Sequence, residues 1–342
     1  MIDTSPHSTA LRSWLYLLAG LVLCMVVVGG ATRLTHSGLT ITEWKPLIGV
    51  IPPLSEADWQ ALFAKYQLIP EYKQVNFGMT LPEFKPLFWW EWSHRFLGRC
   101  VGLVAGLGLL WFLAIPGIRR RYWKPLVGIF ALGALEGIAG WYMVASGLTE
   151  RTDVSQYRLT LHLGLATLII AYTFWTALGI RREMAKVGHG FATALALLLV
   201  AAVYGQILLG GFVAGLDAGL TYNTWPLMDG RLIPHGLHAM KPLWANPFEN
   251  PVTAQFDHRM GAYLVALLAL FNHLSAWQSG DSRLLPSAAL VLTAVLAQVA
   301  LGIWTLLAVV PLPLGLAHQF LAMMLLAAAV FHLHRVVRTI DA

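Results

Sequence analysis

Charged side chains are scarce in this chain, and cysteines are scarcer still. Of its 342 residues, 12% are charged and 57% are hydrophobic, whereas a soluble domain carries about 25% charged residues. The deficit of charge excludes an ordinary water-soluble protein. The two cysteines, Cys24 and Cys100, both fall within apolar runs. That position excludes a disulfide between loops, and we expect both to be small buried packing residues.

Long apolar segments are what the chain has in abundance. A membrane-spanning helix needs about 20 apolar residues, and eight segments meet that requirement: residues 13–32, 95–115, 125–145, 159–179, 191–214, 259–277, 286–309 and 315–334. The first exceeds the apolar core of a signal peptide and is predicted to be a retained helix. No stretch between the segments could form a separate catalytic domain, so any chemistry is expected among the helices or in their loops.

Basic residues predict how the helices are oriented. Three Lys/Arg-rich stretches follow apolar segments: residues 119–124, residues 181–186, and the tail around Arg335 and Arg338. Short basic loops stay in the cytoplasm. We therefore predict a multi-pass protein of the cell inner (cytoplasmic) membrane with both termini cytoplasmic and the two longest loops outside. The formal net charge of +6 is explained by this orientation and does not indicate a nucleic-acid partner.

The chain contains an internal repeat. Residues 29–40 read GGATRLTHSGLT and residues 210–221 read GGFVAGLDAGLT, and a tryptophan follows each at the same distance. We predict an all-α integral membrane fold of two four-helix bundles, an N-terminal half over residues 1–185 and a C-terminal half over residues 186–342. Each half has an even number of spans, so both insert in the same orientation and are expected to be related by a pseudo-twofold axis along the membrane normal.

Four of the twelve histidines occupy equivalent places in the two copies: His94, His162, His258 and His318. Each is expected in the first turns of its helix, and the predicted topology puts all four at one depth near the outer face, two in each bundle. Ionisable residues within membranes are costly and usually functional. A histidine pair between two helices suits haem iron, whereas zinc needs further ligands. A hydrogen-bonded packing role is the alternative for each histidine.

The other histidines are weaker candidates. Four lie near the predicted cytoplasmic side, where we expect them to be solvated: His7, His189, His332 and His334. Three lie in the outer loops, where a surface role or a contact with substrate are both open: His36, His235 and His238.

The two copies differ at charged positions. Glu91 stands three residues before His94, whereas its counterpart before His258 is Gln255. A residue three positions from a ligand shares its helix face, so only the first half places a carboxylate beside its histidine pair. That carboxylate could transfer protons or stabilise positive charge, or it could be an acid at the membrane interface. Glu136 and Gln298 differ in the same way, and either a packing role or a proton path fits Glu136.

Arginines near the outer ends of helices are candidate partners for haem propionates, because a guanidinium binds a carboxylate through paired donors. These are Arg33, Arg95 and Arg259, together with Arg158. Anchoring at the membrane interface accounts equally well for any single one of them.

Several of these stretches together resemble the haem A synthase family. They are residues 29–39 (GGATRLTHSGL), 91–95 (EWSHR), 140–148 (GWYMVASGL) and 256–259 (FDHR). The resemblance covers essentially the whole chain and is closest to the cysteine-poor bacterial and mitochondrial branch. It implies an oxidoreductase that converts the C8 methyl group of haem O into a formyl group by successive hydroxylations, giving haem A for terminal oxidases.

The resemblance also implies roles for individual residues. His258 and His318 match the ligands of a haem b cofactor, His94 and His162 match the substrate haem site, and Glu91 matches a catalytic acid. Besides haem O and membrane lipid, the implied partners are haem O synthase, terminal oxidase assembly factors and further copies of the chain. The outer loops contain no cysteine, so the thiol role found in another branch of the family is excluded here.

Two other functions compete with this interpretation. A two-haem membrane cytochrome that only transfers electrons would hold two equivalent haems and would not need Glu91. A haem-binding or transport protein without chemistry is the second alternative, and neither inverted repeats nor broken helices in matching positions support it. In the long outer loop, Trp59 and Phe63 are spaced as on a short amphipathic helix, which could shield the site from water.

Overall fold

The computed structural model describes residues 6–45, 48–149, 151–180 and 190–337. Within these ranges the regular structure is helical and the prediction of eight membrane-spanning helices is confirmed. The N-terminal spans are α1 (Pro6–Leu34), α4 (Leu81–Leu113), α5 (Pro116–Ala145) and α6 (Gln156–Gly179). The C-terminal spans are α7 (Phe191–Gly215), α9 (Pro251–Gln278), α10 (Leu285–Leu307) and α11 (Leu312–Val337).

Each set of four spans closes into a ring. In the first, α1 packs on α4, α4 on α5, α5 on α6 and α6 on α1; in the second, α7, α9, α10 and α11 follow the same order. The two bundles meet along α1 and α11, α6 and α7, and α6 and α11. Exchanging each helix for its counterpart leaves this set of contacts unchanged, which is compatible with the predicted pseudo-twofold axis. The predicted boundary between residues 185 and 186 lies outside the described residues.

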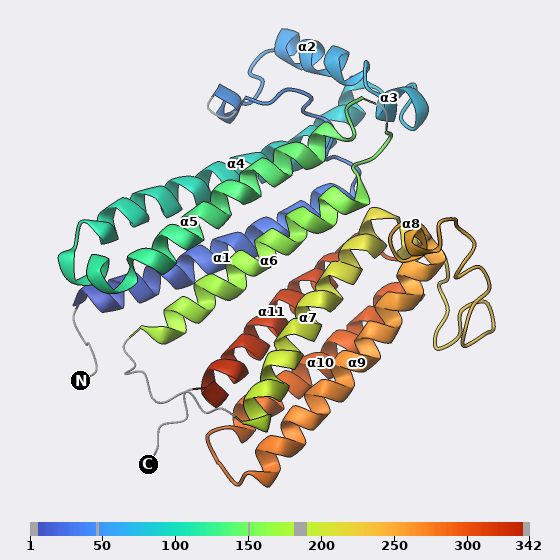
Figure 1. Ribbon diagram of the computed structural model, residues 1–342. Helices are drawn as coiled ribbons and strands as arrows, with labels where there is room; N and C mark the ends of the chain where they lie inside the picture. Colours follow the sequence, from blue (N-terminus) through green and yellow to red (C-terminus); the bar gives the residue numbers. More distant parts are fainter. Residues whose placement is uncertain (1–5, 46–47, 150, 181–189, 338–342) are drawn as a thin grey trace.

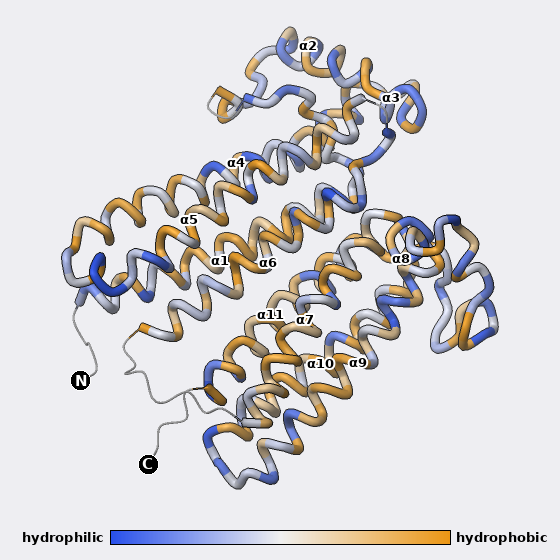
Figure 2. The backbone as a smooth tube through the Cα atoms, viewed as in Figure 1, coloured by the Kyte–Doolittle hydropathy of each residue, from blue (hydrophilic) through white to orange (hydrophobic). Residues whose placement is uncertain are grey.

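The ends of the spans follow from local signals. Helix α4 begins at Leu81, well before the predicted 95, because Thr80 and Glu83 form a reciprocal capping box there. Apolar residues cover the middle of each span and polar residues gather at both ends, as Figure 2 shows. His94 therefore lies several turns inside its helix and not in the first turns as predicted.

A cap covers the end of the N-terminal bundle at which α1 ends and α4 begins. It contains the 3-10 turn η1 (Ile48–Val50) and the helices α2 (Glu56–Tyr66) and α3 (Pro70–Gln74), which sit above α4 in Figure 1. The predicted amphipathic helix is confirmed as α2, and Trp59 packs edge-on against Phe88 of α4 at 4.9 Å between ring centroids. The C-terminal half carries only short elements in the corresponding loop, between α7 and α9: η2 (Ala218–Leu220), η3 (Leu243–Ala245) and α8 (Asn246–Glu249).

Two predictions about the burial of side chains were wrong. His332 and His334 are not solvated: their exposed fractions are 2% and 0%, because the last turns of α11 run inside the bundle. Oγ of Ser287 lies 2.9 Å from Nδ1 of His332, and the ring of His334 packs edge-on against Trp175. Cys24 is exposed on the outside of the bundle and is a free thiol, not a buried packing residue.

Candidate functional site

The four equivalent histidines all project from helices that lie diagonally across their bundles. His94 and His162 belong to α4 and α6, and His258 and His318 belong to α9 and α11. In each ring these two helices do not neighbour one another; the other two helices separate them. A side chain that points inward from either helix therefore reaches the bundle core, where a cofactor can be held between helices.

Each histidine ring packs against a glycine of a neighbouring helix. A Cβ atom placed on that glycine would meet the ring at 2.8–3.2 Å in all four cases. The pairs, glycine first, are Gly29 with His94, Gly140 with His162, Gly210 with His258 and Gly302 with His318. The glycines are thus needed for close approach of the rings. The recurrence in both halves shows that the sequence repeat preserves a packing unit of glycine and histidine.

The C-terminal pair has a geometry that fits a metal between its rings. The ring centroids of His258 and His318 are 6.4 Å apart. Two metal–nitrogen bonds of about 2 Å each, together with the half-widths of the rings, give about 6 Å. In the part of the chain that the structure describes, no cluster of three or more His, Cys, Asp or Glu could hold a metal ion. A pair without further ligands suits haem iron better than zinc.

Glutamines position the C-terminal pair. The amide nitrogen of Gln206, on α7, lies 3.0 Å from Nδ1 of His258 and donates to its carbonyl oxygen at 2.8 Å. Gln298, on α10, donates to the carbonyl of His318 at 3.0 Å and lies 3.2 Å from its Nδ1. A metal-bound histidine donates its other ring N–H to an acceptor. Each glutamine would supply that acceptor with its side-chain amide turned over, so that Oε1, which has no partner among the described residues, accepts from Nδ1. Gln206 was missed from the sequence, although an isolated amide in so apolar a helix was a usable signal.

The first half replaces these amides with other groups. Oε1 of Glu136 lies 3.0 Å from Nδ1 of His162, close enough for an ion pair but not aligned for a hydrogen bond. Glu136 is thus placed beside a candidate ligand, which a general packing role would not require. The counterpart of Gln206 in the repeat is Met25, which cannot orient His94 by a hydrogen bond. The two pairs are therefore not equivalent.

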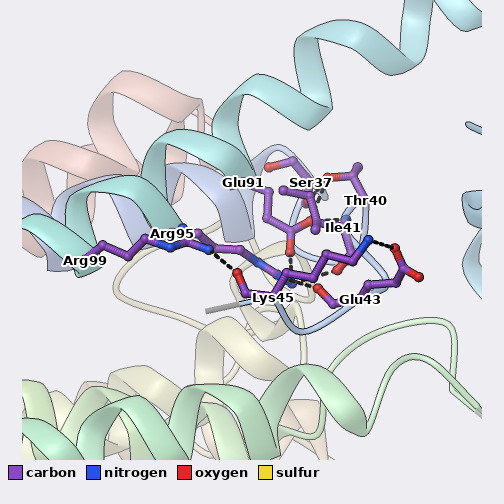
Figure 3. A network of polar contacts seen from close by, with 8 residues as sticks. All are labelled: Ser37, Thr40, Ile41, Glu43, Lys45, Glu91, Arg95 and Arg99. Carbon is purple, nitrogen blue, oxygen red and sulfur yellow. Dashed lines mark hydrogen bonds and ion pairs between the residues drawn. The ribbon is translucent and has the colours of Figure 1, made fainter. Parts of the chain in front are cut away.

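Glu91 is buried, with 3% of its surface exposed, and its carboxylate is fully engaged. One oxygen accepts hydrogen bonds from Oγ1 of Thr40 and from the backbone N–H of Ile41, both at 2.6 Å. The other oxygen accepts from Arg95 at 2.5 Å. Figure 3 shows these groups converging where the loop after α1 crosses α4. Glu91 thus joins the loop to the helix that bears His94.

At the equivalent position of the second half, the guanidinium of Arg259 keeps N–H groups without a hydrogen-bond partner among the described residues. Arg259, the counterpart of Arg95, donates to the carbonyl of Tyr222 at 3.0 Å, as Arg95 does to that of Ile41 at 2.7 Å. Gln255 donates to the same Tyr222 carbonyl at 3.1 Å and supplies no negative charge. Nε and Nη1 of Arg259 are buried and have no hydrogen-bond partner among the described residues. Arg259 is therefore available to a carboxylate, whereas Arg95 is neutralised by Glu91.

Arg33 connects the two halves. Its guanidinium pairs with Asp153 at 2.9 Å and with Asp217 at 3.0 Å, and these acids come from the loops of different bundles. Of the four predicted propionate partners, Arg33 and Arg95 already have acidic partners, and Arg158 donates to the carbonyl of Tyr142 at 2.7 Å. Nε and Nη1 of Arg259 have no partner among the described residues.

A buried acid in the cap is a feature that the sequence did not indicate. Glu71, on α3, is 5% exposed, and burial raises its pKa to about 8. A hydrogen bond from Tyr66 opposes that rise, and the nearby Asp153 adds to it. The hydroxyl of Tyr66 in turn accepts a hydrogen bond from the amide of Asn76 at 2.7 Å. At neutral pH the cap therefore holds a protonated carboxyl group.

This acid should make the cap sensitive to pH. Because its pKa is raised from 4.5 to about 8 on folding, the protonated form stabilises the cap, and that contribution declines as pH rises from 4.5 through 8, by at most about 1.4 kcal/mol per pH unit. Glu71→Gln should remove this dependence. Hydrogen exchange of α2 and α3, compared between variant and wild type at each pH, measures it. The exposed Glu56→Gln is the control; a Glu71→Gln cap with the pH dependence of wild type would contradict the assignment.

Comparisons with known proteins identify the family of this chain. Residues 12–330 match the family model described as cytochrome oxidase assembly protein, COX15-CtaA. A heme A synthase from Parvibaculum lavamentivorans is 49% identical over 98% of this chain and 96% of its own length. One from Chelativorans sp. is 54% identical over 94% and 89%, and one from Azorhizobium caulinodans is 50% identical over 94% and 93%. The chain belongs to the COX15-CtaA family of cytochrome oxidase assembly proteins.

Proposed function

We propose that this protein carries out the haem A synthase reaction, oxidising the C8 methyl group of haem O to a formyl group by successive hydroxylations. The observation that carries the proposal is a duplicated histidine pair whose two copies have different charged surroundings. An oxidoreductase that changes one haem and retains another needs two such sites with unlike environments. A cytochrome that only transfers electrons does not need the difference.

The C-terminal pair is the proposed site of a resident haem b, with His258 and His318 as the axial ligands. The spacing of their rings and the two orienting glutamines support this assignment. Arg259 is the proposed partner of a propionate, because its free N–H groups are buried and need an acceptor. The bound haem would supply a redox centre for the electrons that the reaction releases.

The N-terminal pair is the proposed site of haem O, with His94 and His162 holding the iron. Glu91 lies one helical turn from His94, and Glu136 touches His162. Oxidation of a methyl group releases protons, and a carboxylate close to the reacting carbon can accept them or stabilise positive charge. The protein orients the macrocycle and excludes side reactions, while the redox chemistry belongs to the haem.

The proposed orientation places both termini in the cytoplasm and both histidine pairs toward the outer face of the inner membrane. The basic residues 119–124 lie at the end of the bundle opposite the cap, which supports this orientation. The basic residues 181–186 and Arg338 lie outside the described residues.

Expression in a host that makes haem O but no haem A tests the function. Haem A should appear in extracts of cells with the wild-type chain. Glu91→Gln should lower the ratio of haem A to haem O by about a hundredfold or more, because removing a general acid or base costs about 10²–10⁴ in rate. Pigment analysis by chromatography and mass spectrometry gives that ratio.

Thr40→Val is the matched control. It removes one hydrogen bond to the Glu91 carboxylate and leaves the carboxylate in place. An equal loss in both variants would show that Glu91 acts by anchoring the loop, and full conversion by Glu91→Gln would contradict its catalytic role. Two tightly bound haems without any haem A from the wild-type chain would favour the electron-transfer cytochrome.

A further inference from the structure

A segment of the outer loop runs along the side of α4 in the direction of the membrane. The backbone carbonyls of Ile41 and Glu43 accept hydrogen bonds from Arg95 at 2.7 and 3.0 Å. The carbonyl of Lys45 accepts one from Arg99 at 2.9 Å. Alternate carbonyls thus face the helix, which is the pattern of an extended chain. Figure 3 shows Glu91, Arg95 and Arg99 in a row on α4 with the segment beside them.

The dimensions of the two elements match. From Ile41 to Lys45 an extended chain advances about 13 Å, at about 3.3 Å per residue. From Glu91 to Arg99 a helix advances about 12 Å, at 1.5 Å per residue. The segment and α4 therefore advance by nearly the same distance from the cap toward the other end of the helix. The turn η1 also contacts Arg99, because a Cβ on Gly49 would lie 2.7 Å from Nη2 of that residue.

The helix length indicates how deep this contact lies. Helix α4 ends at Leu113, and a bilayer core takes about 20 helical residues, so the core begins near residue 94. Arg99 is then about one turn inside the core, with its long side chain reaching back toward the interface. The turn η1, which sits on that guanidinium, is expected at the boundary between headgroups and acyl chains. This estimate does not depend on which end of the protein faces the cytoplasm.

The side chains at this depth suit lipid. Residues 48–54 contain no charged side chain, and Ile48 and Ile51 are 75% and 66% exposed. Trp44 and Lys45, just before them, are each 54% exposed. Tryptophan and lysine are the residue types that anchor a segment at a membrane interface. The apolar tip and its anchors follow one another along the chain in the order that the depth requires.

We propose that residues 41–45 and 48–51 form an interfacial wedge, bound to α4 through Arg95 and Arg99 and inserted with Ile48 and Ile51 into the lipid of the outer leaflet. The wedge covers the flank of α4 next to the face that bears His94. Its apolar side chains contact the surrounding lipid. Without the wedge, Arg95 and Arg99 would be exposed to the membrane. A second protein copy or a partner subunit on this face is the competing occupant.

Spin labels test the wedge in the full chain, without haem chemistry. In a background with Cys24→Ala and Cys100→Ala, a nitroxide is attached at Ile51→Cys and the protein is reconstituted in vesicles of phosphatidylcholine and phosphatidylglycerol. Leu107→Cys, exposed on α4, is the lipid reference, and Phe77→Cys, 83% exposed in the cap, is the water reference. Collision rates with oxygen and with a water-soluble nickel chelate are measured.

The label at position 51 should collide with oxygen more often than the label at 77 and less often than the label at 107, which lies deeper in the core. Its collisions with nickel should be several-fold less frequent than those of the label at 77. Nickel collisions equal to those at 77 would overturn the proposal, because the tip would lie in water. Low collision rates with both reagents would also overturn it, because protein would then cover the tip. None of these outcomes depends on haem A formation, so failure here is distinguishable from failure of the proposed function.

A second variant tests the anchor. Arg99→Gln should raise nickel collisions at position 51 several-fold, while the label at 107 stays unchanged and reports an intact bundle. Arg151→Gln, which alters an outer-loop contact with Gln156, is the control. An unchanged position 51 in Arg99→Gln would contradict the assignment of Arg99 as the anchor.

Discussion

His258→Ala should abolish binding of the resident haem. The ring of His258 is one of only two protein ligands proposed for the iron, and the described residues contain no cluster of three or more His, Cys, Asp or Glu that could hold a metal instead. Changing even a partner of a metal-bound histidine costs about 10–100-fold in affinity, so loss of the ligand itself should cost about a hundredfold or more. Absorbance of the purified protein and pyridine haemochrome analysis measure the bound haem b.

His235→Ala is the control for this substitution. His235 is exposed in the outer loop of the same half, away from the bundle core. It should leave the haem content and the low-spin spectrum unchanged. A His258→Ala protein that kept the spectrum of wild type would show that the C-terminal pair is not the axial ligand set.

Gly140→Ala should remove most conversion of haem O while the resident haem stays bound. The new methyl group would lie 2.9 Å from Cε1 of His162, so the ring must move. A displacement of about 1 Å at a reacting site can cost about a hundredfold in rate. The substitution also favours helix formation by about 1 kcal/mol, so a loss of activity cannot be ascribed to a weaker helix. The ratio of haem A to haem O in extracts and the haem b content of the protein are the readouts.

Gly137→Ala provides a matched control in the same helix. A Cβ at Gly137 meets nothing within 4 Å, and the gain in helix propensity is the same. Conversion should equal that of wild type. If Gly140→Ala also converted haem O normally, the close packing of His162 on this glycine would have no functional importance.

The sequence predicted the parts of the fold that depend on hydropathy and repetition. Eight apolar runs and two copies of the GG and GLT elements were sufficient for the eight spans and their order. Hydropathy did not show where α4 begins, because residues 81–94 are aromatic and polar. Their helix starts at the capping box formed by Thr80 and Glu83. Hydropathy also did not predict the burial of His332 and His334. A polar residue near a helix end is assumed to meet water unless a neighbouring helix is known to cover it.

The candidate site was predicted in its residue types but not in its contacts. The equivalence of the histidines and the change from Glu91 to Gln255 followed from the aligned copies. The consequence for Arg95 and Arg259 did not, because it depends on which loop carbonyl each guanidinium reaches. The role of the four glycines also required the structure. Glycine is frequent wherever membrane helices approach closely, so its presence in a span does not indicate which side chain of the neighbouring helix packs against it.

The contrast between Arg95 and Arg259 gives the duplicated site a physical basis for unequal roles. In the first half a carboxylate neutralises the guanidinium and draws the loop onto α4. In the second half an amide leaves the guanidinium with free donors for an anionic group. In the proposed function, this single acid-to-amide exchange distinguishes the substrate site from the site of the resident cofactor.

The most direct test of this division of labour is the haem content of two double variants purified from cells that make no haem O. The chain with His94→Ala and His162→Ala should retain one low-spin haem b per chain with the spectrum of wild type. The chain with His258→Ala and His318→Ala should retain none. Equal loss of haem in the two variants, or retention by the second and loss from the first, would contradict the assignment of the C-terminal pair to the resident haem.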